Sequence, residues 1–527
     1  MSETTPLLTT HQQEQRLEWK VVVAILSGTV AEFVAAADST ITSTLSTTIS
    51  NEFGSLTLIS WLGAGYLIGE AATQPLTGKL SDLFGRKSSF IAATIIFALG
   101  NLMCAFASSY VMIILGRVIA GIGASGCTSI SSFICTDHVP PRHRGIWHST
   151  FIIAYTGGMG IGAVFGGAIN DALGWRWPFI IISPIAICCG ISMGIFLPKQ
   201  GTDDASIRER LGRIDYGGSI TLVSSLTLFL FFTNSEKPII ALLPASAILM
   251  VLFIIIELRW AREPIIPMSI FTTPTILATC LCVGFMAMTL YTLLYYLPLY
   301  LQLRGNSTST TGLLLLPEPI GGGIGSTTVG LITSMTGKYS APKIVQPLLI
   351  VLGAFGLSMI SLTTPQFVPA ICQFVYGFGY GGLLTTMTVT LLSAVPHKMQ
   401  ARSTSAMFTF RSIGSTVGLS VSGVFFRSCL SSQVARTGEN EYSLAMNGTG
   451  DHFQTKNSHV PLTDEDSPDV FMYALHRTFQ LAGVFAVCGF ICAFFIKNNK
   501  LASSIDGDKE DTTEYTRVNA SEEVERI

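Results

Sequence analysis

The stretch "GKLSDLFGRK", residues 78–87, joins two apolar runs and decides the fold that we expect for this chain. Glycine suits a sharp connection because it adopts backbone conformations that other residues avoid, and Gly78 and Gly85 stand near the two ends of this one. Asp82 is placed to accept hydrogen bonds from the N-terminus of a neighbouring helix. A short charged loop between two long apolar runs indicates a connection between membrane spans.

The composition agrees with a membrane protein. Apolar residues make up 49% of the 527 residues and charged residues 12%, whereas about a quarter are charged in an average soluble domain. The formal net charge of −2 predicts no nucleic-acid partner. The 11 cysteines fall almost wholly within apolar runs and lack metal-ligand spacing, so we interpret them as reduced core residues. With no nucleotide loop or nucleophile triad either, the sequence predicts no enzyme, no catalytic residue, no metal and no cofactor.

Fourteen segments are apolar over a window of about 19 residues, which is the length of a membrane-spanning helix. The polar first 18 or so residues do not resemble a signal peptide, and the first apolar run is too long for one, so we expect it to remain as a span. An even number of spans places both termini on one side. The predicted spans are 20–43, 57–77, 88–108, 111–133, 148–170, 178–197, 217–234, 238–257, 275–301, 312–333, 345–363, 367–393, 406–428 and 475–497.

Lysine and arginine predict which side this is. Most of them follow even-numbered spans, among them Arg86 and Lys87, which we expect to anchor at anionic headgroups. Because basic residues concentrate in cytosolic loops, both termini are predicted to be cytosolic. The glycosylation sequons at Asn306 ("NST") and Asn447 ("NGT") fall in connections on the opposite side, where this modification occurs.

An internal repeat predicts the domain organisation. The stretch "GLITSMTGKY", residues 330–339, has glycines at its first and eighth places and a basic residue at its ninth, as 78–87 does, and it follows the tenth span. This indicates a duplicated bundle of six spans. We predict a cytosolic tail at 1–19, an N-terminal bundle at 20–200, a linker with two inserted helices at 201–270, a C-terminal bundle at 271–499 with a long luminal loop at 430–474, and a disordered cytosolic tail at 500–527.

Several strings carry a resemblance to one family. The stretch at 78–87 matches the signature loop of the major facilitator superfamily, and "LGRVIAGIGASG" (115–126) resembles its fourth-span motif, with Arg117 inside the membrane. "GMGIGAVFGG" (158–167) is similar to the fifth-span motif of the antiporter branch, G-x-x-x-G-P-x-x-G-G, except that Ala163 replaces the usual proline and leaves the kink of that motif open. The resemblance implies a conformational role for the loop residues and for Gly158, Gly162, Gly166 and Gly167.

Three further strings, "ADST" (37–40), "DALGWRWPFIIISP" (171–184) and "LPLYLQLRGNSTSTTGLLLLP" (297–317), resemble the fungal 14-span proton-coupled branch. That branch includes multidrug exporters and vacuolar basic amino-acid transporters. The resemblance implies an all-α integral membrane protein with 14 transmembrane helices, two six-helix bundles plus a central inserted pair, that acts as a monomer. Its substrate cavity is expected between the bundles, with alternating access by rocking.

Acidic residues inside predicted spans point to the substrate. A charge at the bilayer centre costs at least ~2.5 to 3.5 kcal/mol on insertion scales, so each one needs a reason. Glu32 and Glu70 lie about halfway along the first two spans, and Gln74 shares a helix face with Glu70. We favour Glu70 as a cation contact, with a plain proton site as the alternative. Related transporters more often hold small or neutral residues at the two glutamate positions. We therefore expect a cationic substrate, with Glu318, between two prolines, as a contact from the second half.

Other intramembrane residues leave two interpretations open. Asp38 lies six positions after Glu32, about 600° of helical rotation, so the two acids need not serve one site. The resemblance favours proton coupling for Asp38 over a packing role, and for Arg117 a proton relay over a fixed ion pair. Tyr291 and Tyr295 are candidates for substrate contacts, with core packing as the alternative.

The remaining signals concern the ends of spans and the chain start. Arg411, just inside the thirteenth span, is expected to extend to the cytosolic interface. Glu3, Leu7 and Leu8 in "ETTPLL" fit a dileucine address for a sorting adaptor, which favours the vacuolar membrane over the plasma membrane.

The sequence thus predicts a proton-coupled antiporter in the lipid bilayer that moves a small cationic solute, first of all a basic amino acid, from the cytosol into the vacuole. Multidrug efflux at the plasma membrane is the alternative within transport. A non-transporting nutrient sensor is the alternative of another class, and the short tails disfavour it.

Overall fold

The computed structural model describes residues 19–54, 57–139, 141–198, 216–234, 240–259, 273–336, 340–395, 397–437 and 467–497. Within these ranges the chain is helical, with short turns between helices and no β-strand. The predicted all-α class is therefore confirmed.

The helices fall into three groups along the chain. The N-terminal half contains α1 (Trp19–Glu52), α2 (Thr57–Phe84), α3 (Arg86–Ala105), α4 (Tyr110–His138), α5 (Pro141–Leu173) and α6 (Trp177–Phe196). A pair follows, α8 (Tyr216–Asn234) and α9 (Leu242–Arg259). The C-terminal half contains α10 (Pro274–Leu303), α11 (Thr308–Leu314), α12 (Pro317–Thr336), α13 (Pro342–Ser358), α14 (Phe367–Ala394), α15 (His397–Thr437) and α17 (Ser467–Phe494).

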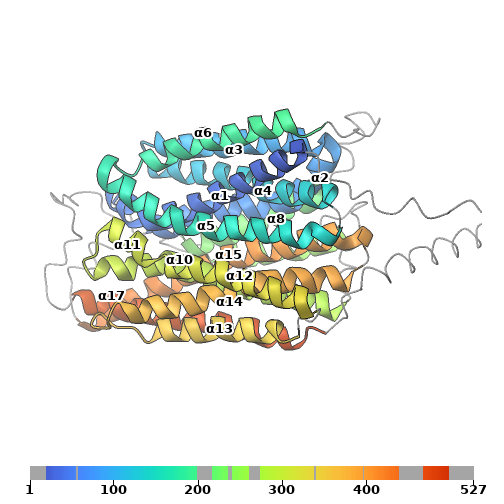
Figure 1. The fold of residues 1–527 in the computed structure, drawn as a ribbon. Helices are drawn as coiled ribbons and strands as arrows, with labels where there is room; N and C mark the ends of the chain where they lie inside the picture. Colours follow the sequence, from blue (N-terminus) through green and yellow to red (C-terminus); the bar gives the residue numbers. More distant parts are fainter. Residues whose placement is uncertain are drawn as a thin grey trace, which may run out of the picture.

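The two halves lie side by side and repeat one packing scheme (Figure 1). In the first half α1 packs on α5 and α6, α3 packs on α4 and α6, and α2 packs on α4. In the second half α10 packs on α15 and α17, α13 on α14 and α17, and α12 on α14. Each half also reaches across in the same way, because α2 contacts α15 and α12 contacts α5. This recurrence is what an internal duplication produces.

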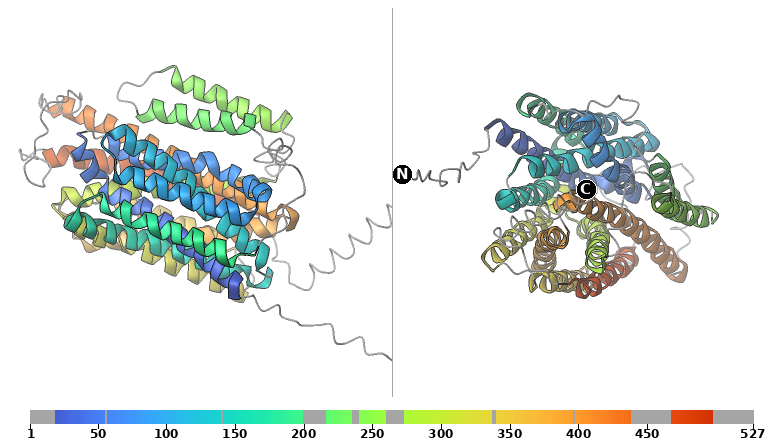
Figure 2. Two further views of the ribbon diagram at one scale, coloured as in Figure 1. Left: turned by 90° about the horizontal axis from the view of Figure 1, so that it is seen from above. Right: turned by 90° about the vertical axis from the view of Figure 1, so that its right-hand side faces the viewer.

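The pair α8 and α9 stands apart from both halves (Figure 2). Helix α8 contacts α2 and α15, and α9 packs on α8. Arg427 of α15 donates a hydrogen bond of 2.6 Å to the Thr233 carbonyl at the end of α8. The pair therefore rests against the seam between the halves and belongs to neither six-helix scheme.

Ten helices in the described ranges, α1, α3–α6, α9, α10, α14, α15 and α17, are long and apolar enough to cross a membrane. Helices α8 and α13 hold shorter apolar segments. Helices α2 and α12 fall outside both sets, and α2 carries Glu70 and Gln74, which lower its mean hydropathy. Every predicted span coincides with a helix, but the number of fourteen membrane crossings stays a prediction.

Several predicted spans differ from the helices in their bounds. The second was predicted at 57–77, whereas α2 runs to Phe84, and the thirteenth at 406–428, whereas α15 runs from His397 to Thr437. The first was predicted to end at residue 43, whereas α1 continues to Glu52. Serine and threonine hydroxyls make this possible, because Thr42 and Ser46, for example, donate to carbonyls of their own helix at 2.8 and 2.7 Å. The tenth predicted span divides into α11 and α12, since a turn at residues 315–316 precedes Pro317.

Glycines allow close helix approach where α12 crosses α14. A Cβ atom at Gly377 would overlap the Glu318 carbonyl oxygen and lie 2.9 Å from its Cα atom. One turn further, Gly381 stands in the same relation to Gly322. These small residues let α12 and α14 pack closely.

The stretch 78–87, expected as a loop, is mostly helical: α2 continues through Gly78 to Phe84 and α3 begins at Arg86, so the sharp turn is confined to Gly85. Gly85 has a φ of 86°, which glycine adopts without strain. Gly174, with a φ of 97°, turns the chain between α5 and α6 at the opposite end of the bundle. We call these ends the Gly85 end and the Gly174 end. The start of α1 and the end of α17 both lie at the Gly85 end (Figure 1).

The basic residues of this turn bind protein groups, which corrects the expectation that they reach lipid headgroups. Arg86 Nη1 lies 2.6 Å from Asp82 Oδ1, and Arg86 Nε donates to Asp137 Oδ2 at 3.0 Å. Lys87 donates to the Leu197 carbonyl at 3.0 Å, just after α6. The start of α3 turns both side chains back toward α4 and α6, so the turn fastens three helices together. A Cβ atom at Gly78 would lie 3.8 Å from the Phe133 ring of α4, so a larger residue would fit there.

Candidate functional site

A cavity of about 170 Å³ lies between the two halves. It belongs to the part of the molecule near the Gly85 end, because its walls come from the last turns of α4 and α14 and the first turns of α5 and α15. Among the described residues that line it, the charged side chains are Glu32 and Arg411. The lining residues are Glu32, Gln74, Thr128, Ser132, Phe133, Thr136, Phe151, Ile152, Tyr155, Val283, Leu384, Thr385, Thr388, Val389, Leu392, Thr404, Met407, Phe408 and Arg411.

Arg411 projects into this cavity, which corrects its predicted place at the cytosolic interface. Its Nη2 atom lies 3.9 Å from Glu70 Oε1, and Ser412 donates to the same oxygen at 3.5 Å. The guanidinium lies over two rings, 5.4 Å from the centre of Tyr155 and 5.5 Å from that of Phe408. If the Arg411 side chain extended to the interface instead, it would lose these contacts.

The structure brings three predicted substrate contacts together. Glu32 lies within electrostatic range of both Arg411 and Glu70. Gln74, one turn from Glu70, lines the cavity and donates from Nε2 to Ser129 Oγ at 2.8 Å. Glu70 itself lies behind Arg411 and is buried. The three side chains come from α1 and α2, and Arg411 of α15 extends the cluster into the other half.

The two predicted tyrosines lie beside the cavity. Tyr291 is hydrogen-bonded to Tyr155, whose ring supports Arg411. Tyr295 packs closely against Gly63 of α2, on the side of Arg117. Tyr155 was missed by the sequence analysis; the signal available was its place one turn before the glycine motif of α5.

Glu318 is not brought to this cluster. It lines a separate space of about 10 Å³ with Thr40, Ser43 and Leu294, nearer the Gly174 end. The short break between α11 and α12 sets it there, because Glu318 stands in the first turn of α12. A contact with a substrate held at Glu32 and Glu70 would require movement along the interface.

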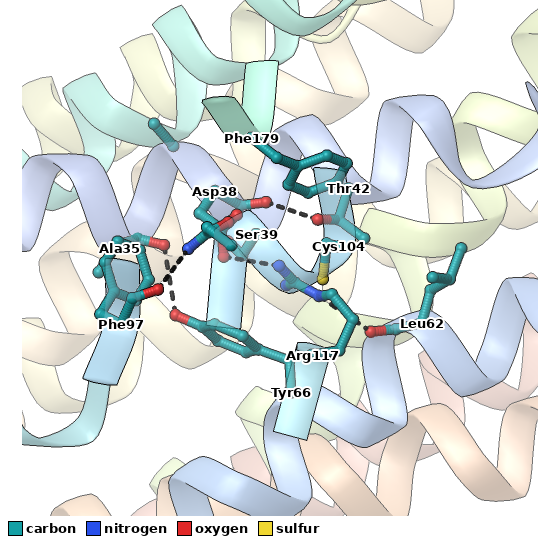
Figure 3. Close-up of polar contacts among 12 residues, drawn as sticks. Ala35, Asp38, Ser39, Thr42, Leu62, Tyr66, Phe97, Cys104, Arg117 and Phe179 are labelled. Atoms are coloured by element: carbon teal, nitrogen blue, oxygen red, sulfur yellow. Dashed lines mark hydrogen bonds and ion pairs between the residues drawn. The ribbon is translucent and has the colours of Figure 1, made fainter. Parts of the chain in front are cut away.

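Asp38 and Arg117 form a buried ion pair inside the N-terminal half (Figure 3). Arg117 Nη1 donates to Asp38 Oδ2 at 2.7 Å, and both side chains are 0% exposed. Arg117 also lies 4.5 Å from the centre of the Tyr66 ring and donates from Nε to the Leu62 carbonyl at 3.4 Å. The remaining atoms, Asp38 Oδ1 and Arg117 Nη2, have no hydrogen-bond partner among the described residues. The two acids of α1 thus have different partners, as their separation along the helix predicts.

The glycine motif of α5 packs on two neighbours. Gly158, Gly162 and Gly166 face α1, where they approach the Phe33 carbonyl, Ala37 and Ile41. Gly167 instead faces the Thr308 carbonyl at the start of α11. Helix α5 runs without interruption through Ala163. The motif therefore contacts α1 within the N-terminal half and the start of α11 in the C-terminal half.

Hydrogen bonds connect the halves at the Gly174 end. Thr47 of α1 donates to the side-chain oxygen of Gln302, and Gln302 Nε2 donates to the Thr44 carbonyl at 3.3 Å. Asp171, after the glycine motif of α5, accepts from the backbone and hydroxyl of Ser309, with the backbone bond at 3.2 Å. The two halves are therefore in direct contact at this end.

Of the residues predicted for glycosylation and sorting, the structure describes one. Asn306 lies between α10 and α11, where its Nδ2 atom donates to the Leu301 carbonyl at 2.7 Å. Asn447, Glu3, Leu7 and Leu8 lie outside the described residues.

Fungal transporters are among the proteins most similar to this chain. The vacuolar membrane amino acid uptake transporter fnx2 of Schizosaccharomyces pombe is 29% identical, over 92% of this chain and 85% of its own length. The multidrug resistance protein fnx1 of the same yeast is 30% identical, with 93% and 94% covered. The efflux pump FUS6 of Gibberella fujikuroi is 28% identical, with 96% and 94% covered.

A solved structure shares the fold. A bacterial homolog of the human lysosomal transporter Spinster, in an inward-facing and occupied conformation, matches with a TM-score of 0.61 and 17% identity, over 90% of this chain and 96% of that one. The sequence profile of the Major Facilitator Superfamily matches residues 29–419. With the paired six-helix scheme and the cavity between the halves, this match over most of the chain shows that the protein belongs to the major facilitator superfamily.

Proposed function

We propose that the protein is a proton-coupled antiporter that carries cationic solutes, basic amino acids first among them, from the cytosol into the vacuole. One observation carries this proposal: the cavity between the halves holds Glu32, with Glu70 behind Arg411. Carboxylates that face a cavity of low dielectric constant attract cations more strongly than they do in water. A neutral solute would gain nothing from them.

The position of the cavity supports loading from the cytosol. The distribution of basic residues predicts that the Gly85 end is cytosolic, and the cavity lies in that part of the molecule. The hydrogen bonds of Asp171 and Gln302 close the opposite end. Rocking of the halves would break these contacts and expose the cavity to the lumen.

Competition between a proton and the substrate would supply the coupling. A carboxylate that accepts a proton from the acidic lumen loses its attraction for a cation, so one group does not hold both. We assign substrate contact to Glu32 and Glu70 and proton relay to Asp38 with Arg117. Asp38 Oδ1 has no hydrogen-bond partner in the described structure, so it is the oxygen to which a proton would add once water reaches it, while Oδ2 faces Arg117.

The finer parts of the proposal concern location and the remaining contacts. The dileucine-like signal and the amino-acid transporter among the relatives support the vacuolar membrane. The relatives that are multidrug and efflux proteins support the alternative, efflux of cationic compounds at the plasma membrane. Gln74, Tyr291, Tyr295 and Glu318 remain proposed substrate contacts, and glycosylation of Asn306 and Asn447 remains a proposal as well.

Transport into vesicles tests the function. Vacuolar vesicles that hold this protein as their one carrier for these solutes should take up labelled arginine, lysine or histidine when the lumen is acidic, and a protonophore should abolish the uptake. If none of the three accumulates with the gradient present, the amino-acid proposal is wrong.

Replacing Glu70 by glutamine tests the site. The loss of a charged partner is worth about 1.5–3 kcal/mol, so the KM for the cation should rise roughly 10- to 150-fold. The control is Glu52→Gln, which removes an exposed acid at the Gly174 end. An unchanged KM in the Glu70 variant would remove Glu70 from the site and leave the class of protein intact.

A further inference from the structure

We infer that Arg411 binds the α-carboxylate of the transported solute, so that the cavity selects amino acids over cations that lack a carboxylate. The inference rests on the proposed function and adds the group that recognises the anionic part of the substrate. Two arginines within the predicted spans, Arg117 and Arg411, differ in how closely each is paired with a carboxylate.

Arg117 is held by its carboxylate partner at hydrogen-bond distance in a fully buried site, and Arg411 is not. Arg117 contacts Asp38 at 2.7 Å with both side chains 0% exposed. Arg411 contacts Glu70 through a single pair of atoms at 3.9 Å, and its side chain keeps 12% exposure. Charge-assisted hydrogen bonds are normally about 2.7–2.9 Å long. The contact of Arg411 with Glu70 is thus too long for a strong hydrogen bond, and the guanidinium retains free donors that face the cavity.

Two aromatic rings hold the guanidinium in place. Tyr155 belongs to the N-terminal half and Phe408 to the C-terminal half, and both rings lie within 5.5 Å of the guanidinium carbon. Contacts with ring faces leave the N–H groups at the edge of the guanidinium unused. A planar edge with parallel donors is the group that binds a carboxylate through two hydrogen bonds.

The charges of the cluster are the reverse of those on a basic amino acid. Glu32, Glu70 and Arg411 supply two negative charges and one positive charge when both acids are ionised. Arginine or lysine carries two cations and one carboxylate, so each charge finds an opposite partner. A diamine such as cadaverine would leave Arg411 without an anion and place two further cations beside it. The same cavity is therefore expected to reject it.

Pairs of compounds that differ only in the α-carboxylate test this selectivity. Unlabelled arginine is compared with agmatine, and lysine with cadaverine, as competitors of labelled arginine uptake in vesicles and as ligands of the purified protein in nanodiscs. We expect each amino acid to bind roughly 10-fold or more tightly than its decarboxylated partner. Equal binding within each pair would overturn the inference and leave a cation transporter. Binding of no member of either pair would overturn the proposed function, and the inference with it.

The variant Arg411→Gln separates recognition from support of the fold. Arginine should lose its 10-fold advantage, while agmatine should bind as well as before or better, because a repelling cation is gone. A purely structural role would weaken both compounds by the same factor, and that result would refute the inference. The matched control is Arg477→Gln, since Arg477 is exposed on α17, and it should preserve the preference. If the Arg411 variant does not fold, the comparison of the paired compounds on the unaltered protein still decides.

Discussion

Replacing Asp38 by asparagine should destabilise the protein, because it leaves the positive charge of Arg117 without its counter-ion. Both side chains are 0% exposed and joined at 2.7 Å. Breaking a buried pair by removal of one partner costs about 3–5 kcal/mol, since the other charge stays desolvated. Tyr66 and the Leu62 carbonyl, the other neighbours of Arg117, carry no full charge and do not replace the carboxylate.

Removal of both charges should be much less harmful. Methionine replaces the unbranched stem of arginine without a charge and adapts to irregular spaces, so we expect Asp38→Asn with Arg117→Met to recover most of the loss. For a domain of 150–250 residues, 1 kcal/mol shifts the melting temperature by about 2–4 °C. If the N-terminal half unfolds as one unit, the single variant should therefore melt on the order of 10 °C lower.

The assay is thermal unfolding of purified protein in one detergent, followed as the fraction that remains monodisperse after heating. The control is Glu52→Gln, because Glu52 forms a pair with Arg176 in which the two side chains are about 40% exposed. Exposed pairs contribute about 0–1 kcal/mol. The claim that each buried charge depends on the other would be refuted by either of two results. One is a single Asp38 variant that melts at the temperature of the control, and the other is a double variant that melts no higher than the single one.

Two further perturbations follow from packing and from the contact between the halves. Gly377→Ala should lower the melting temperature, because the new Cβ atom overlaps the Glu318 carbonyl, whereas Gly483→Ala, with nothing within 4 Å, should be neutral or stabilising in the same assay. Asp171→Ala removes both hydrogen bonds from Ser309 and should favour opening of the Gly174 end by about 1–3 kcal/mol. The measurement is amide hydrogen exchange of residues 308–314, and unchanged protection there would contradict a closing role for Asp171.

The class of fold was accessible from the sequence because bilayer thickness sets helix length. Each of the fourteen apolar segments coincides with a helix, since a segment of that length in lipid satisfies its backbone only as a helix. The predicted ends of the spans were wrong where a helix continues through polar residues beyond its apolar segment. In the last turns of α1, hydroxyl groups bond to the helix itself, so a hydropathy window ends the span before the helix ends.

The candidate site was accessible in part. The acids could be found because a carboxyl group in an apolar run is costly and rare, and the helical rotation between Glu32 and Asp38 separated their roles. An ion pair of Arg117 was among the interpretations, but the partner of Glu70 could not be found, since Arg411 lies 341 positions later and no local pattern links them. The same limit explains Arg86, whose partner Asp137 comes from another helix. Distance along the chain hides ion pairs, and only the packing of helices reveals them.

In the proposed antiport mechanism, the contrast between the two arginines also constrains where proton coupling can begin. A group that loads and unloads a proton in each cycle must change its charge at modest cost. Glu70, with its nearest cation at 3.9 Å and a cavity beside it, meets that condition in this conformation. Asp38 does not, because neutralising it here would carry much of the cost expected for Asp38→Asn. If Asp38 is the proton carrier, α1 and α4 must therefore separate, or water must reach Oδ1, in the conformation open to the lumen.

The glycine motif of α5 packs on α1 around Ala37 and Ile41, on both sides of Asp38. Rocking at the Gly174 end, where the same helix contacts α11, thus has a direct mechanical route to the ion pair.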